Sequence, residues 1–244
     1  MNKIQKKATT ILMNTLKFLV FTCSFLFVTS QAAAQFLTSS SQQLLVVVYG
    51  DVLTSNSYLP HEQTFPFQLE KRLRIIGFDV SVLAMGETEF TTSTALEKLP
   101  NLIGTSPDLV IVQLGETDIK REFSAVGIIN NIKNIIDALK KSGIYVIVMA
   151  PKMPETMDTD YNKKIRDFYT KMSKYTPLYP YTLQDIAGNS ERTISDNYLP
   201  NSNGVEVMVN GLYIMVDTGL RWRLDVINKM RLKTLKNQHK EKRR

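Results

Sequence analysis

Short apolar runs alternate along this chain with longer stretches in which apolar residues recur every three or four positions. The short runs are typical of strands buried on both faces. They predict strands at Leu44–Tyr49, Val80–Leu83, Leu109–Gln113, Tyr145–Met149 and Leu178–Tyr181. The longer stretches predict helices at Phe65–Ile76, Ser93–Leu102, Ala125–Lys141, Asp160–Tyr175 and from Asn203 to about Asp217. This alternation predicts a three-layer α/β/α sandwich around a mainly parallel, five-stranded sheet.

The helix predicted at 125–141 has the clearest amphipathic pattern. We expect its core-facing side to carry Val126, Ile129, Ile132, Ile136 and Leu139. No internal repeat and no second domain boundary interrupts the pattern, so residues 44–228 are predicted to form one domain.

The first 34 residues differ from the rest. Four lysines precede or flank the apolar run Phe18–Val28, which is short for a membrane span, and Ala32 and Ala34 form an A-x-A arrangement. We predict a signal peptide over residues 1–34, followed by a linker over 35–43. An uncleaved anchor helix is the alternative. Either way the chain is expected to be exported, to the periplasm or outside the cell.

The cysteine content and the charge distribution exclude several kinds of functional site and partner. The single cysteine, Cys23, lies in the predicted signal peptide, so the mature chain has no disulfide, no cysteine nucleophile and no thiolate metal site. The net charge of +7 resides in the ends of the chain, because eight Lys/Arg and one Glu lie in residues 229–244. The body is mildly acidic, which argues against nucleic acid as a partner.

The basic segment 229–244 continues a helical spacing of Leu220, Leu224, Ile227 and Met230. One interpretation is a packed final helix followed by a disordered, solubilising tail. The other is a tail that tethers the protein electrostatically to an anionic surface.

Ligands of parallel α/β sheets bind beside the carboxyl ends of the strands. Four segments are predicted to gather there. They read YGDVLTS, AMGETEFTT, LGETDIK and SDNYLPN and cover residues 49–55, 84–92, 114–120 and 195–201. The functional residues are therefore expected in these segments.

In order and spacing, these segments resemble the SGNH (GDSL) hydrolases, in particular their periplasmic thioesterase, lysophospholipase and arylesterase type. The resemblance covers residues 44–220 and includes LEKLPNLIGTSPDLVIVQLG, YVIVMAPKMP and YNKKIRDFYTKMSKY. It implies a flavodoxin-like fold and a serine nucleophile in a Gly-Asp-Ser-Leu turn. It also implies an oxyanion hole from a glycine and an asparagine, and an Asp-x-x-His pair that supplies the base.

The chain departs from this pattern at most catalytic positions. The serine position falls on Val52, the oxyanion glycine on Glu89 and the asparagine on Thr117. In the segment DNYLP, Asp196 is retained and Leu199 stands in place of the histidine. The other motif residues predicted to line the cleft are Gly50, Asp51, Gly115, Glu116, Asp118 and Pro200.

Nearby hydroxyls and the two remaining histidines are poor substitutes. Thr54, Ser55 and Ser57 are better explained as capping or loop hydroxyls. His61 lies in a polar loop and His239 in the basic tail, so neither replaces Leu199 by position.

The substitutions add negative charge at the predicted strand ends, where Glu89 and Glu116 join Asp51, Asp118 and Asp196. The glutamates either extend into solvent or form a site for a hard divalent ion or a cationic ligand. A carboxylate-based hydrolase of the glycosidase kind is a third interpretation. No Zn-type His/Cys cluster and no Gly-rich phosphate loop is present, and no cofactor is expected.

The sequence thus predicts a catalytically inactive member of a carboxylic-ester or thioester hydrolase family that keeps a binding role. Its unidentified ligand would occupy the former ester cleft and be acyl or cationic. The alternatives are an active esterase, thioesterase or lysophospholipase, and an accessory protein that binds the cell-envelope surface through its basic tail.

Overall fold

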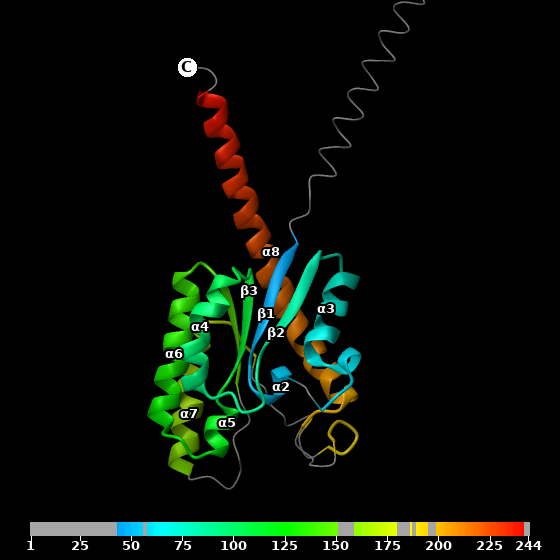
Figure 1. Ribbon diagram of the computed structural model, residues 1–244, viewed down its shortest axis with the longest axis vertical. Helices are drawn as coiled ribbons and strands as arrows, with labels where there is room; N and C mark the ends of the chain where they lie inside the picture. The colour runs from blue at the N-terminus through cyan, green and yellow to red at the C-terminus, as the bar shows by residue number, and fades with distance from the viewer. Residues whose placement is uncertain are drawn as a thin grey trace, which may run out of the picture. The chain divides into compact units, whose positions relative to one another are not determined.

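Five parallel strands form one sheet with the spatial order β2-β1-β3-β4-β5 in the computed structural model. The structure describes residues 43–55, 58–150, 159–179, 186, 189–194 and 199–241, which belong to the unit that spans residues 43–244. The predicted signal peptide, with Cys23, lies outside the described residues, as do Asp196 and Ser57. Helices cover both faces of the sheet (Figure 1), so the predicted α/β/α architecture is confirmed.

The strands are β1 (Leu44–Gly50), β2 (Val80–Gly86), β3 (Leu109–Gln113), β4 (Tyr145–Met149) and β5 (Leu178–Tyr179). The longer helices are α3 (Phe65–Ile75), α4 (Thr92–Gly104), α6 (Ala125–Lys141), α7 (Thr159–Met172) and α8 (Ser202–Glu241). Three short helices are α2 (Val52–Ser55), η1 (His61–Gln63) and α5 (Glu116–Lys120). Helix α2 begins two residues after the end of β1, and α5 begins three residues after the end of β3.

Two hydrophobic cores lie on opposite faces of the sheet, because successive strand residues point to opposite sides. Val46 and Val48 pack with α3 and α8, whereas Val47 and Tyr49 pack with α4, α6 and α7. Burial on both faces explains why the central strands are continuous apolar runs.

The predicted core face of α6 was wrong at one end. Val126 is 59% exposed, and Ile128 and Ile135 are buried instead, together with Ile132, Ile136 and Leu139. The two candidate stripes are adjacent on the same helix. Contact with β4 and α7 selects one of them, which sequence spacing alone does not do.

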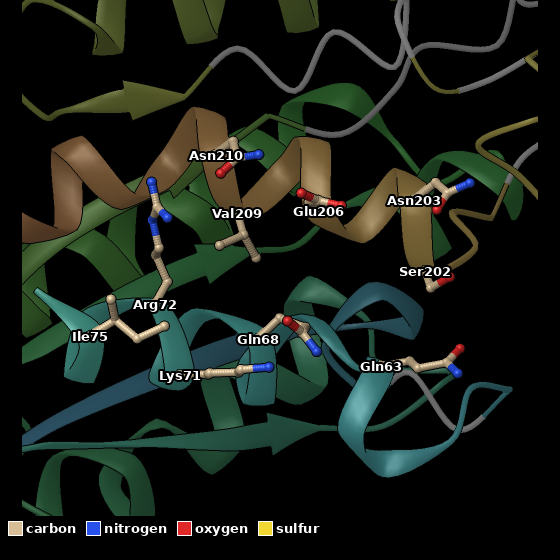
Figure 2. Close-up of a pocket in the computed structure, with 10 residues that line it drawn as sticks. All are labelled: Gln63, Gln68, Lys71, Arg72, Ile75, Ser202, Asn203, Glu206, Val209 and Asn210. Carbon is tan, nitrogen blue, oxygen red and sulfur yellow. The ribbon is translucent and has the colours of Figure 1, made fainter.

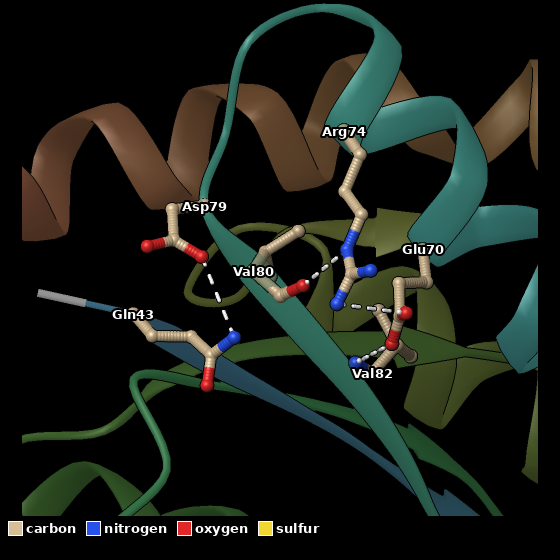
Figure 3. Close-up of polar contacts among 6 residues, drawn as sticks. All are labelled: Gln43, Glu70, Arg74, Asp79, Val80 and Val82. Carbon is tan, nitrogen blue, oxygen red and sulfur yellow. Dashed lines mark hydrogen bonds and ion pairs between the residues drawn. The ribbon is translucent and has the colours of Figure 1, made fainter. Parts of the chain in front are cut away.

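The outer edge of β2 is covered by polar side chains of α3 (Figure 3). The Glu70 carboxylate accepts the Val82 N–H at 2.7 Å, and the Arg74 Nε–H donates to the Val80 carbonyl at 2.9 Å. Glu70 and Arg74 also form an ion pair at 3.0 Å. These contacts satisfy backbone groups that an edge strand would otherwise offer to another chain.

Helix α8 is much longer than predicted. The pattern indicated an end near Asp217, but the helix continues to Glu241. The Arg223 guanidinium bonds to the buried Asp108 carboxylate at 2.9 Å, and the Trp222 ring lies 5.4 Å from that of Tyr145. Asp108 precedes β3 and Tyr145 begins β4, so these contacts fix α8 at the amino ends of the strands. Beyond them the helix projects away from the sheet (Figure 1).

Candidate functional site

The carboxyl ends of β1 and β3 are adjacent, and the chain turns to different faces of the sheet after them. The connection from β1 to β2 runs through α3, and the connection from β2 to β3 runs through α4 on the opposite face. Ligand sites of open parallel sheets lie at such a switch point. Two of the predicted motifs, which begin at Gly50 and Gly115, therefore meet at this place.

Close packing of backbone explains two glycines at these strand ends. Gly50 and Gly86 are opposite each other in the β1–β2 register. A Cβ on Gly86 would collide with the Gly50 carbonyl, and a Cβ on Gly50 would collide with the Gln113 carbonyl. Gly115 precedes α5 with φ of +104°, a conformation that favours glycine.

Asp51 connects the two strand ends. Its N–H donates to the Gln113 carbonyl at 3.2 Å, and its Oδ2 accepts the Glu116 N–H at 3.2 Å. The side chain is fully buried. Asp51 therefore fixes the start of α5 against the end of β1, which is a positioning role.

A second buried carboxylate, that of Glu116, lies next to Asp51 and is 1% exposed. Burial, and then the negative charge of Glu116, raise the pKa of Asp51 to about 8. The Lys120 ammonium balances part of this charge by an ion pair with Glu116 at 3.1 Å. The phenol of Tyr169 has a raised pKa, because it is buried and feels the charges of Asp51 and Asp118. The site is thus electronegative inside.

The other predicted carboxylates point elsewhere. Asp118 accepts both the N–H and the hydroxyl of Thr92, at 2.9 and 2.6 Å, and so ties α5 to the start of α4. The Glu89 side chain extends into solvent and pairs with Arg121. Within the described part of the chain, no three His, Cys, Asp or Glu side chains converge on a metal-binding point. The predicted divalent-ion site therefore has no ligand set there.

The residues at the predicted serine and histidine positions are aliphatic and partly buried. Val52 begins α2 directly after the turn, and both Val52 and Leu199 pack against the core cluster between the sheet and α3/α8. Thr117, at the predicted asparagine position, donates its hydroxyl to the Thr88 carbonyl at 3.4 Å.

The substitute groups do not form a nucleophile–base pair. Thr54 is buried, with its hydroxyl 3.5 Å from Gln113 Oε1. His61 stacks edge-on against Phe67 with ring centroids 5.1 Å apart, and His239 lies near the far end of α8. Thr54 therefore contacts Gln113, and His61 contacts Phe67.

The segment after Leu199 forms a structure that sequence analysis missed. Thr193 and Pro200 form an isolated antiparallel bridge. Asn201 donates to the Glu191 and Thr193 carbonyls, each at 3.1 Å, and its Oδ1 accepts the Asn203 and Gly204 N–H groups at the start of α8. Asparagine directly before a helical stretch is an N-cap signal, so the motif could have been identified.

A pocket of about 290 Å³ lies between α3 and α8 (Figure 2). One end of the pocket is lined by Gln63 and by Ser202 and Asn203, and the latter two follow Leu199 by three and four residues. The pocket extends past Arg72 to Ile75. Its lining is mainly amides and charged groups, so it suits a polar ligand better than an acyl chain.

No protein-family model matches the chain. Proteins named as esterases are nevertheless similar to it in sequence. It is 31% identical over 178 residues to an arylesterase of Vibrio mimicus, which covers 72% of this chain and 86% of that protein. It is 27% identical over 163 residues to the esterase TesA of Pseudomonas aeruginosa, with 66% and 77% covered.

Solved structures show the same fold. The crystal structure of TesA superposes with a TM-score of 0.67 at 21% identity, covering 72% of this chain and 99% of that one. AlinE4, an esterase of the SGNH-hydrolase family, superposes with a TM-score of 0.60 at 24% identity, covering 75% and 99%. Together with the 31% sequence match to an arylesterase, these comparisons establish that the chain belongs to the SGNH (GDSL) hydrolase family.

Proposed function

We propose that this chain is an exported SGNH-family protein that has lost ester hydrolysis and retains a binding role. The observation that carries the proposal is the aliphatic character of Val52 and Leu199 at the predicted serine and histidine positions. Both are partly buried and pack against the same hydrophobic core. A triad without nucleophile and base keeps only the residual rate supplied by binding and the oxyanion hole.

The predicted oxyanion hole is also poorly suited to its task. Thr117 already donates its hydroxyl to the Thr88 carbonyl, and Glu89 lies in solvent beside Arg121. The buried Glu116 carboxylate, which raises the pKa of the neighbouring Asp51, places negative potential near the strand ends. An oxyanion needs donors and positive potential, so these features oppose its formation.

An active esterase is the second candidate, and the 31% identity to an arylesterase favours it. Hydrolysis of p-nitrophenyl acetate, butyrate and decanoate distinguishes the two. We expect rates equal to those of buffer with an equal concentration of an unrelated protein. Turnover above this level that disappears in a variant such as Asp51→Asn would support the esterase and overturn the proposal.

Restoring the lost groups tests the assignment of positions. The quadruple variant Val52→Ser, Glu89→Gly, Thr117→Asn, Leu199→His should react with a fluorophosphonate probe. The matched control keeps three of the changes but has Val52→Ala, and it should not react. A folded quadruple variant that stays unlabelled would contradict the assignment, with folding checked by circular dichroism.

Ligand binding is measured separately. Short- and long-chain alkyl amides mimic esters but resist cleavage, and a ligand that binds only the folded state raises the melting temperature. We expect a concentration-dependent rise for at least one chain length, reduced by Val52→Asp. Unchanged melting temperatures for all amides, together with no hydrolysis, would contradict a retained role for the ester cleft.

A further inference from the structure

The last part of α8, residues 228–241, is exposed on all sides. At 1.5 Å per residue this segment is about 20 Å long, and it projects from the end of the sheet opposite the candidate site (Figure 1). Core packing therefore does not explain its sequence. A solvated helix of this kind either has no binding role or presents one face to a partner.

Four lysines lie along one face of this segment. Lys229, Lys233, Lys236 and Lys240 follow one another at intervals of four, three and four residues. This spacing places them in a single row. Lys229 also pairs with Asp225 one turn earlier, at 2.6 Å. Like charges in such a row destabilise an isolated helix, so the row is not accounted for by helix stability.

Two leucines border the lysine row. Leu232 is 58% exposed and lies three residues after Lys229 and four before Lys236, and Leu235, 49% exposed, continues its line. The rest of the circumference carries Arg231 and Glu241 together with Met230, Thr234, Asn237 and Gln238. Leu232 therefore adds exposed aliphatic area directly beside the lysine row, and Leu235 extends this area toward Arg231.

We propose that this lysine and leucine face binds the surface of a bilayer that contains anionic lipids. Lysines attract anionic head groups while neighbouring leucines enter the boundary of the acyl chains. The exposed leucines favour a lipid surface over nucleic acid, which would contact charge alone. The lysine row would repel the same row of a second copy. Among the described residues, no helix has both the length and the hydropathy to cross a membrane.

Vesicle binding tests this proposal. The protein should sediment with vesicles of phosphatidylcholine and phosphatidylglycerol at low salt, and much less with vesicles of phosphatidylcholine alone. Replacing the four lysines of the row by glutamine should weaken binding by about 100-fold or more, given the attraction of each lysine to an anionic surface. A control variant with four exposed body lysines changed to glutamine should bind normally; these are Lys141, Lys163, Lys171 and Lys174.

The contact of the leucine positions with the bilayer can be measured separately by tryptophan fluorescence. Trp222 is the chain's one tryptophan, so Trp222→Phe with Leu232→Trp moves the fluorescent group into the proposed contact face. Its emission should shift to the blue with anionic vesicles. Equal binding by the lysine-row variant, absence of any emission shift, or binding of duplex DNA but not of vesicles would overturn the proposal. So would salt-dependent dimers without vesicle binding.

Discussion

Asp51→Asn should change how the stability of this protein depends on pH. The Asp51 carboxyl is fully buried beside the buried Glu116 carboxylate. In the folded protein its pKa is raised to about 8, first by burial and then by the charge of Glu116. In the unfolded chain the same group titrates near its ordinary pKa of about 3.9. Folding therefore costs free energy wherever Asp51 would otherwise be ionised.

The direction in which stability changes with pH follows from the number of protons that the folded and unfolded states bind. Between pH 4 and about pH 8 the folded state keeps a proton on Asp51 that the unfolded state has released. The contribution of this group to the free energy of unfolding is thus full below pH 4. It falls by about 1.4 kcal/mol for each pH unit up to the folded pKa. Asparagine cannot ionise, and its carbonyl can still accept the Glu116 N–H.

Urea unfolding followed by circular dichroism at pH 5, 6, 7 and 8 measures this effect. The free energy of unfolding of Asp51→Asn minus that of the wild type should rise with pH by about 1 kcal/mol per unit. The exposed Asp79 provides the control, because Asp79→Asn should leave the wild-type slope unchanged. Parallel profiles for Asp51→Asn and wild type would refute the raised pKa.

Three further substitutions test the contacts that hold the site and α8. Arg223→Met leaves the buried Asp108 carboxylate without its cation and should lower the free energy of unfolding, measured in urea, by about 2 kcal/mol. Full recovery on adding Asp108→Asn would show that the loss comes from the unpaired buried charge. An unchanged stability of Arg223→Met would refute this role of the ion pair. Gly86→Ala forces a methyl group onto the Gly50 carbonyl and should lower the free energy of unfolding by about 2 kcal/mol or more, measured by thermal unfolding. An unchanged stability would contradict the close approach of β1 and β2. Asn201→Ala removes both the N-cap acceptor of α8 and the amide donor to the Glu191 and Thr193 carbonyls, and should cost about 1 kcal/mol or more by thermal unfolding. Asn201→Asp keeps the acceptor but loses the donor, so it should recover part of this loss. An unchanged stability of Asn201→Ala would contradict the capping role.

Much of the fold could be predicted from the sequence. Strands such as Leu109–Gln113 are buried on both faces and so read as unbroken apolar runs, and helices such as α6 show a 3.6-residue period. Gly115 belongs to a motif that resembles a family segment, and in the structure it adopts the left-handed conformation that favours glycine. The family pattern placed the candidate site at the ends of β1 and β3 for the same reason: these motifs are local in sequence.

Tertiary contacts decided the rest. Sequence grouped Glu89, Glu116, Asp51, Asp118 and Asp196 as one acidic cluster, and Asp196 lies outside the described residues. Among the other four, Asp51 and Glu116 are buried neighbours, Asp118 is buried against Thr92, and Glu89 extends into solvent. Which way a carboxylate points depends on partners far away in the chain, such as Thr92 for Asp118.

The same reason governs the length of α8. Its inner half is fixed by the sheet and by Asp108, which lies 115 residues before Arg223. Its outer half has no core to pack against, so the apolar period that marks a buried helix is lost there. By itself the sequence determined the family, the order of elements and the absence of a serine and a histidine at the motif positions. Only the folded chain decided which charges are buried together and how far the last helix extends beyond the core, because both depend on contacts between residues that are distant in the sequence.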